Sequence, residues 1–112
     1  MKSLKRVRNR LHRCYELTFK VMFEEPGAEN FTLVHGYIFI HGHALGHAWI
    51  ETGDGRVYDT RLDRYMPRDE YVANWRAVIE RRYTRVEAAQ ASSKAGHYGP
   101  WHRSKLIEPL IG

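Results

Sequence analysis

The spacing of apolar residues near the start of the chain predicts a helix. Apolar or small side chains recur at steps of three and four residues from Leu4 to Val21, which is the spacing of one helical face. We predict a helix over about residues 14–24, which Pro26 and Gly27 end. The pattern leaves open whether the preceding residues form a separate helix or continue into this one.

Three short runs after this helix have the composition of β-strands. They are FTLVHGYIFI at residues 31–40, HAWIET at 47–52 and RVYDTRL at 56–62. The Gly-Asp-Gly sequence between the last two runs favours a hairpin. The segment HGHALG, residues 41–46, is expected to be a loop or a distorted strand end.

The rest of the chain is predicted to be helical and then irregular. Residues 66–80, MPRDEYVANWRAVIE, resemble a short helix, with a proline and two acidic residues favourably placed near its start. Thr84 and Glu87 match a capping box at the start of another helix, which Gly96 is expected to close. Two prolines prevent a long helix in the tail that follows.

These elements predict an α+β fold with an antiparallel sheet. We expect an N-terminal helix packed on a small antiparallel sheet of about three strands, followed by two short helices. At 112 residues the chain is expected to form a single domain. Within residues 1–112 we distinguish a basic arm at 1–13, a core that carries the candidate chemistry at 14–65, and the C-terminal helices and tail at 66–112.

Composition places the chain among ordinary globular proteins. Its 43% hydrophobic and 28% charged residues are typical of a folded domain, and no apolar run approaches the about 20 residues needed to span a bilayer. The basic start is not followed by the apolar segment of a secretory signal. The single cysteine, Cys14, excludes an intramolecular disulfide and favours a reducing compartment. We therefore expect a cytoplasmic protein with no membrane association.

The positive charge is concentrated at the start of the chain. The net charge is +5, and residues 1–13 hold six cations and no acids, which leaves 5 − 6 = −1 for the remainder. The six are Lys2, Lys5, Arg6, Arg8, Arg10 and Arg13. Such an arm is suited to binding nucleic acid or an acidic protein. The alternative is an ordinary solvated helix face or chain terminus.

Cys14, His47 and Asp59 have the residue types and chain positions of a thiol catalytic triad. A reactive thiol needs a base to take its proton and a third group to orient that base. Cys14 lies at or near the start of the first predicted helix, where the helix dipole and free N–H groups favour a thiolate. His47 begins a predicted strand and Asp59 follows it across the Gly-Asp-Gly turn, so the two can lie side by side. Regular alternation puts Trp49 and Glu51 on the same face as His47.

This arrangement resembles the transglutaminase-like branch of the papain-like cysteine hydrolases. The similarity covers about residues 12–62, and GHAWIE followed by VYDT is its most specific part. The resemblance implies a minimal papain-like core with Cys14 as nucleophile, His47 as general base and Asp59 as the carboxylate that orients it. It also implies cysteine-dependent hydrolysis or acyl transfer at a peptide, isopeptide or other amide bond, with a protein or peptide substrate and no cofactor.

Further residues are candidates for the oxyanion hole or the substrate cleft. The flank LHRCYELT differs from the flank containing glycine and tryptophan that is usual in this family. The oxyanion-hole candidates are Asn9, His12 and the backbone N–H of Cys14. The cleft candidates are His43, Trp49, Tyr98 and Trp101. The last two, in the tail, alternatively pack across the sheet edge as a structural lid.

These residues also have interpretations that involve no catalysis. Cys14 in an apolar helical stripe can be a small core residue, and Asp59 can cap a turn or pair with Arg56 or Arg61. The chain is then a non-catalytic binding module that uses the basic arm. Four histidines within thirteen positions also suggest a transition-metal site: His35, His41, His43 and His47. No carboxylate or second cysteine stands at a recognised ligand spacing beside them, so we expect no metal.

Overall fold

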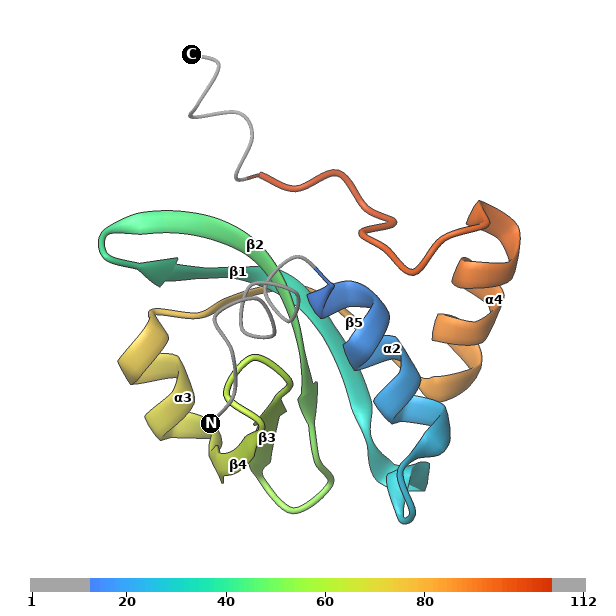
Figure 1. Ribbon diagram of the computed structural model, residues 1–112, viewed down its shortest axis with the longest axis horizontal. Coiled ribbons are helices and arrows are strands. Elements are labelled where there is room, and N and C mark those ends of the chain that lie inside the picture. Colours follow the sequence, from blue (N-terminus) through green and yellow to red (C-terminus); the bar gives the residue numbers. More distant parts are fainter. Residues whose placement is uncertain (1–12, 106–112) are drawn as a thin grey trace, which may run out of the picture.

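The computed structural model describes residues 13–105 as a twisted antiparallel sheet with helices on both faces (Figure 1). Within this range the helices are α2 (Cys14–Glu24), α3 (Arg68–Trp75) and α4 (Arg85–Ala95), with a 3-10 turn, η1, at Ala28–Asn30. The strands in the same range are β1 (Thr32–Ile40), β2 (His43–Glu51), β3 (Arg56–Asp59), β4 (Arg64–Pro67) and β5 (Val78–Tyr83). Their order in the sheet is β4-β3-β2-β1-β5, and every neighbouring pair is antiparallel.

The predicted fold, a helix on about three strands followed by two helices, is wrong about the sheet. The described residues form five strands, because the segment expected to be one helix at 66–80 ends β4, forms α3 and enters β5. The helix stops where Arg76 adopts a left-handed conformation (φ 49°) and the Ala77 N–H bonds back to the Val72 carbonyl. β5 has the sequence VIERRY, half of it charged, so it leaves no apolar run to be seen in the sequence.

The loop expected at residues 41–46 is also corrected. β1 and β2 form one long hairpin, paired from Thr32 opposite Glu51 to Ile40 opposite His43. Two residues, His41 and Gly42, make the turn, both with positive φ (52° and 79°). Two consecutive left-handed residues match the twist of a tight hairpin, so β2 begins before His47 rather than at it.

The local helix signals are confirmed. α2 has the bounds that the periodicity predicts, 14–24. At the start of α4 the Glu87 N–H donates to Thr84 Oγ1 at 3.1 Å, and the Thr84 N–H donates to Glu87 Oε1 at 2.8 Å. Gly96, in a left-handed conformation, closes the same helix. These features depend only on residues within about one helical turn of each other.

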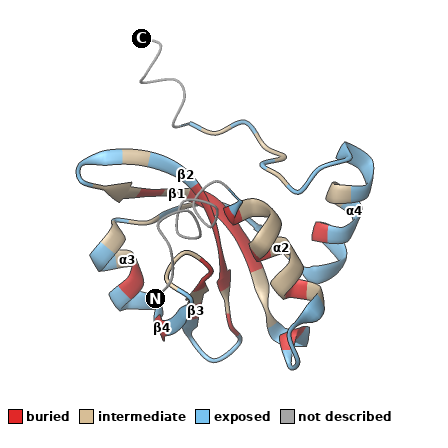
Figure 2. Ribbon diagram, in the orientation of Figure 1, coloured by how far each residue is buried: buried red, intermediate tan, exposed pale blue. Residues whose placement is uncertain are grey.

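The sheet separates two hydrophobic clusters. Alternation along β2 directs Trp49 to the face covered by α3 and Ile50 to the face covered by α2 and α4. Tyr71 of α3 belongs to the first cluster, and Met22 of α2 and Ala88 of α4 belong to the second. Figure 2 shows these buried positions along the central strands and on the helix sides that face them. The candidate chemistry lies where β2 and β3 separate between these two layers.

The described part of the tail, residues 97–105, packs against the α2 side of the sheet. The ring centroid of Trp101 lies 4.9 Å from that of His35 and 5.0 Å from that of Tyr83. The ring centroid of Tyr98 lies 5.1 Å from that of Phe19 on α2. These contacts extend the cluster that contains Met22.

The described residues bear on two of the expected partners, the membrane and the ligand of the basic arm. No helix within residues 13–105 is long and apolar enough to cross a membrane. Of the basic arm, residues 1–12 lie outside the described residues. The guanidinium of Arg13 forms an ion pair with Glu16 at 3.0 Å.

Candidate active site

The geometry of β2 and β3 brings His47 and Asp59 together. The two strands pair at Ile50 opposite Tyr58 and at Glu51 opposite Val57, and then they diverge. His47 lies on β2 just past this pairing, and Asp59 is the last residue of β3. His47 Nε2 and Asp59 Oδ2 lie 3.0 Å apart across the opening. The Gly-Asp-Gly turn therefore joins the two strands that carry the imidazole and the carboxylate.

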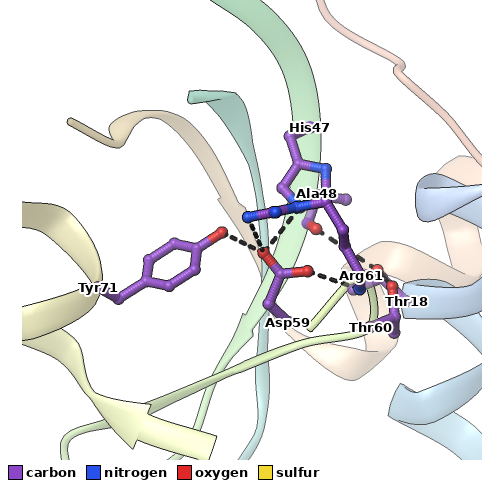
Figure 3. A network of polar contacts seen from close by, with 7 residues as sticks. All are labelled: Thr18, His47, Ala48, Asp59, Thr60, Arg61 and Tyr71. Atoms are coloured by element: carbon purple, nitrogen blue, oxygen red, sulfur yellow. Dashed lines mark hydrogen bonds and ion pairs between the residues drawn. The ribbon is translucent and has the colours of Figure 1, made fainter. Parts of the chain in front are cut away.

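Packing of α2 against β2 places Cys14 at the same opening. Thr18 Oγ1 donates a hydrogen bond to the Ala48 carbonyl at 3.5 Å, and it lies 3.5 Å from Thr60 Oγ1 (Figure 3). These contacts join α2 to β2 and to the segment after β3. Cys14 lies one helical turn before Thr18, and it is among the groups that raise the pKa of His47. The structure thus brings together the three residues that the sequence singles out.

The Asp59 carboxylate is held by donors from several elements. Tyr71 on α3 donates its hydroxyl to Oδ2 at 2.6 Å, and the Arg61 N–H donates to Oδ1 at 2.7 Å (Figure 3). Burial, the largest single effect, favours the neutral acid, but the hydrogen bonds from His47 and Tyr71 and the charges of His47 and Arg61 outweigh it. Together they lower the pKa of Asp59 below its usual value. Asp59 is therefore ionised at neutral pH, and the proton in the hydrogen bond between His47 Nε2 and Asp59 Oδ2 lies on Nε2.

His47 favours its charged form even though its side chain is buried. Burial is the largest single effect and lowers its pKa, but the hydrogen bonds and charges of Asp59 and Cys14 together outweigh it. The pKa of His47 is raised from 6.5 to about 9. Because Nε2 is bound to Asp59, Nδ1 is the ring nitrogen left to face Cys14. At neutral pH the site therefore holds an imidazolium between a carboxylate and a sulfur atom.

The start of α2 places backbone N–H groups near Cys14 that have no acceptor within the helix. The helix begins at Cys14, and its first internal hydrogen bond runs from the Leu17 N–H to the Arg13 carbonyl at 2.8 Å. The N–H groups of Cys14, Tyr15 and Glu16 therefore have no acceptor within the helix. Together with the helix dipole, they favour negative charge at this end. The Cys14 N–H remains the oxyanion-hole candidate that the described residues contain, since Asn9 and His12 lie outside them.

The site is enclosed. Cys14 and His47 are each 3% exposed, and Asp59 is fully buried. The Trp49 ring is stacked near the His47 ring, with centroids 6.1 Å apart and planes at 30°. Trp49 itself is 1% exposed within the α3-side cluster, so it supports the imidazole from the core and does not line a cleft. Exclusion of water strengthens the electrostatic interactions among these groups.

The other cleft candidates lie on the β1–β2 hairpin and in the tail. His43 is exposed at the end of the β1–β2 hairpin, four residues or about 13 Å along the strand from His47. Tyr98 and Trp101 pack on the α2-side cluster through Phe19 and through the ring contacts of the tail. Trp101 packs against the α2-side cluster, whereas Tyr98 remains 37% exposed.

Two further residues contact Asp59. The sequence pattern does not identify Tyr71, and it identifies Arg61 only in a non-catalytic interpretation. Tyr71 does not stand out, because a tyrosine among the apolar residues of a helix gives no local sign of its hydroxyl partner. Arg61 is predicted only as a partner of Asp59. It does lie near that carboxylate, with Nη2 at 3.7 Å from Oδ2, and its guanidinium stacks on Trp75 at 4.1 Å. Asp59 therefore combines turn capping and charge pairing with its bond to His47.

The histidines do not form a metal site in the described part of the chain. Between residues 13 and 105 no group of three histidine, cysteine or acidic side chains is arranged to hold a metal ion. His35 is fully buried between Tyr15 and Trp101 rather than grouped with the histidines of the hairpin. Its burial, with a smaller effect from His102, lowers its pKa to about 3, so it is neutral.

Comparison of the chain with protein-family models, with curated proteins and with solved structures finds no match in any of the three.

Proposed function

We propose that this protein is a cysteine-dependent hydrolase or acyltransferase that acts on a peptide, isopeptide or other amide bond. The observation that supports this most directly is that Asp59, 3.0 Å from His47, and Cys14, at the start of α2, together favour the charged form of the buried His47 imidazole. The order of these residues along the chain, with Cys before His before Asp, is similar to that in the transglutaminase-like cysteine enzymes. The substrate partner is then a protein or peptide.

The proposed reaction uses each member of the triad in turn. The Cys14 thiolate attacks the amide carbonyl carbon, and the carbonyl π electrons move to oxygen, which the Cys14 N–H can stabilise. As the C–N bond breaks, the His47 imidazolium donates its Nδ1 proton to the leaving amine. Water or a second amine then attacks the thioester while neutral His47 takes its proton, and the thiolate leaves. Asp59 keeps Nε2 protonated throughout.

A small alkylating reagent tests this proposal without knowledge of the substrate. At pH 6 an ordinary thiol with pKa near 8.5 is only about 0.3% ionised, so it reacts slowly with iodoacetamide. Cys14 beside an imidazolium is expected to react at pH 6 at least about 10-fold faster than the same enclosed thiol does when the imidazolium is removed. Intact-mass analysis over time gives the rate, because the chain holds one cysteine.

Two histidine variants identify the source of any fast reaction. His47→Ala removes the imidazolium and is expected to slow alkylation at pH 6 by at least about 10-fold. His43→Ala removes an exposed histidine from the same strand and is expected to leave the rate unchanged. An alkylation rate that is the same in the unmodified protein and in His47→Ala would refute the proposal.

The alternative of a nucleic-acid or acidic-protein binding module depends on the basic arm. Its residues 1–12 lie outside the described range, and Arg13 is already paired with Glu16.

A further inference from the structure

Tyr71 reaches the triad from the opposite side of the sheet to α2. Its hydroxyl lies 2.6 Å from Asp59 Oδ2, the same oxygen that His47 Nε2 contacts at 3.0 Å. Its ring centroid lies 5.5 Å from that of Trp49, which in turn is stacked near His47. Tyr71 is fully buried. One α3 side chain therefore contacts the carboxylate directly and supports the imidazole through Trp49.

The hydroxyl of Tyr71 is a donor directed at a charge. Burial, followed by the negative charge of Asp59, raises the pKa of Tyr71 above its usual value, so it keeps its proton. A phenylalanine would fill the same apolar space between Trp49 and the rest of the α3-side cluster. The hydroxyl therefore adds nothing to that packing, and its hydrogen bond goes to Asp59.

The donors around Asp59 together fix its orientation. The backbone N–H of Arg61 donates to Oδ1 of Asp59, and the Tyr71 hydroxyl and His47 Nε2 both contact Oδ2 (Figure 3). The Arg61 guanidinium attracts the carboxylate by its charge but does not orient it. Its Nη2 atom lies 3.7 Å from Oδ2, and neither Nη2 nor Nε makes a hydrogen bond. Tyr71 is thus the side chain other than His47 that sets the direction of Oδ2.

We propose that Tyr71 is a positioning residue of this triad. Its hydroxyl fixes Asp59 Oδ2, so that the Nε2–H group of His47 points at Asp59 and Nδ1 faces Cys14. This role rests on the proposed function. The titratable and charged groups facing Asp59 are His47 on β2, Tyr71 on α3 and Arg61 after β3, with Cys14 on α2 acting through His47.

Tyr71→Phe tests the role through two measurements. The first is the pKa of Asp59, followed by carboxyl ¹³C NMR, which is expected to rise by about one to two pH units because a hydrogen bond to a charged group is lost. The second is the rate of Cys14 alkylation by iodoacetamide at pH 6, expected to fall about 10-fold. Tyr58→Phe is the matched control, because Tyr58 also donates to an aspartate, at 2.7 Å, on the other face of β3. It is expected to change neither measurement.

Replacing Tyr71 with 3-fluorotyrosine reverses the expected shift. The fluorinated phenol is a stronger hydrogen-bond donor of nearly the same size, so the pKa of Asp59 is expected to fall further. A role in packing alone would leave that pKa unchanged. This variant also decides the matter if Tyr71→Phe fails to fold.

The possible results separate this inference from the proposed function. Alkylation that depends on His47 but is unaffected by Tyr71→Phe overturns the positioning role even if the pKa of Asp59 rises. An unchanged pKa of Asp59 in both Tyr71 variants also overturns it. Slow alkylation that is indifferent to His47 overturns the proposed function, and the role of Tyr71 in it falls as well.

Discussion

Raising the pH from 6 to 10 should remove a stabilising contribution that His47 makes to the folded protein. Its pKa is raised from 6.5 to about 9 in the folded state, because Asp59 and Cys14 hold the imidazolium against the cost of burial. The folded protein therefore binds this proton more tightly than the unfolded chain does. The resulting stabilisation is fully present below pH 6.5, declines as the pH rises from 6.5 to 9, and is lost above about 9.

The size of the effect follows from the change in pKa. At 1.36 kcal/mol per pH unit, a rise from 6.5 to about 9 corresponds to about 3 kcal/mol of unfolding free energy. Solvent screening does not reduce this figure, because His47 is 3% exposed. The lowered pKa of Asp59 describes the same interaction seen from the carboxylate, so it is not added. The stabilisation that comes from the ionised Asp59 is present above the pKa of this residue in the unfolded chain. It is lost only in acid, as the pH falls through the lowered pKa of Asp59 in the folded state.

Urea unfolding at pH 6 and pH 10 measures this contribution. Other groups also titrate in this range, so His47→Gln provides the reference, because it retains polarity but cannot be protonated. The unmodified protein is expected to lose about 3 kcal/mol more than His47→Gln over this interval. Equal losses in the two proteins, with unchanged dependence on urea concentration, would show that His47 is not held charged by Asp59 and Cys14.

Two further substitutions test the packing and the capping that support the site. Gly36→Ala would place a Cβ 1.9 Å from the Val78 carbonyl oxygen, so β1 and β5 must separate and urea unfolding should show a loss of about 3 kcal/mol or more. A loss below about 1 kcal/mol would mean that the strands are not so closely apposed. Thr84→Ala removes the hydroxyl that caps α4 and is expected to cost about 1 kcal/mol by the same assay. Thr84→Ser keeps that hydroxyl and should cost little, so equal losses in both variants would contradict the capping role.

Part of the site can be found from the sequence, because some of its requirements are chemical. Cys14, His47 and Asp59 stand out by residue type, by order and by their positions relative to a helix start and a turn. Tyr71 cannot be found in this way. His47 and Tyr71 each stand twelve residues from Asp59, but a hairpin connects His47 to it, whereas Tyr71 meets it only through the docking of α3.

The elements of the fold also divide into those that local sequence features predict and those that depend on distant contacts. α2 and the capping box of α4 depend on interactions within about one turn, so the sequence predicts their positions correctly. The sequence pattern wrongly assigns the start of β5 to the end of a helix, because this half-charged segment becomes a strand only by pairing with β1, more than forty positions earlier. Local propensity carries little information about such a partner.

The sequence by itself determined where the helices α2 and α4 lie and where the Gly-Asp-Gly hairpin turns, and it identified which side chains are candidates for thiol chemistry. The tertiary structure alone decided that the sheet has five strands in the described range, that β2 and β3 diverge after two residue pairs, and that Cys14, Tyr71 and Arg61 reach the opening between them. The physical reason is distance along the chain: backbone geometry and neighbouring side chains set the first group, whereas the second depends on how separate elements bury their apolar faces against one another.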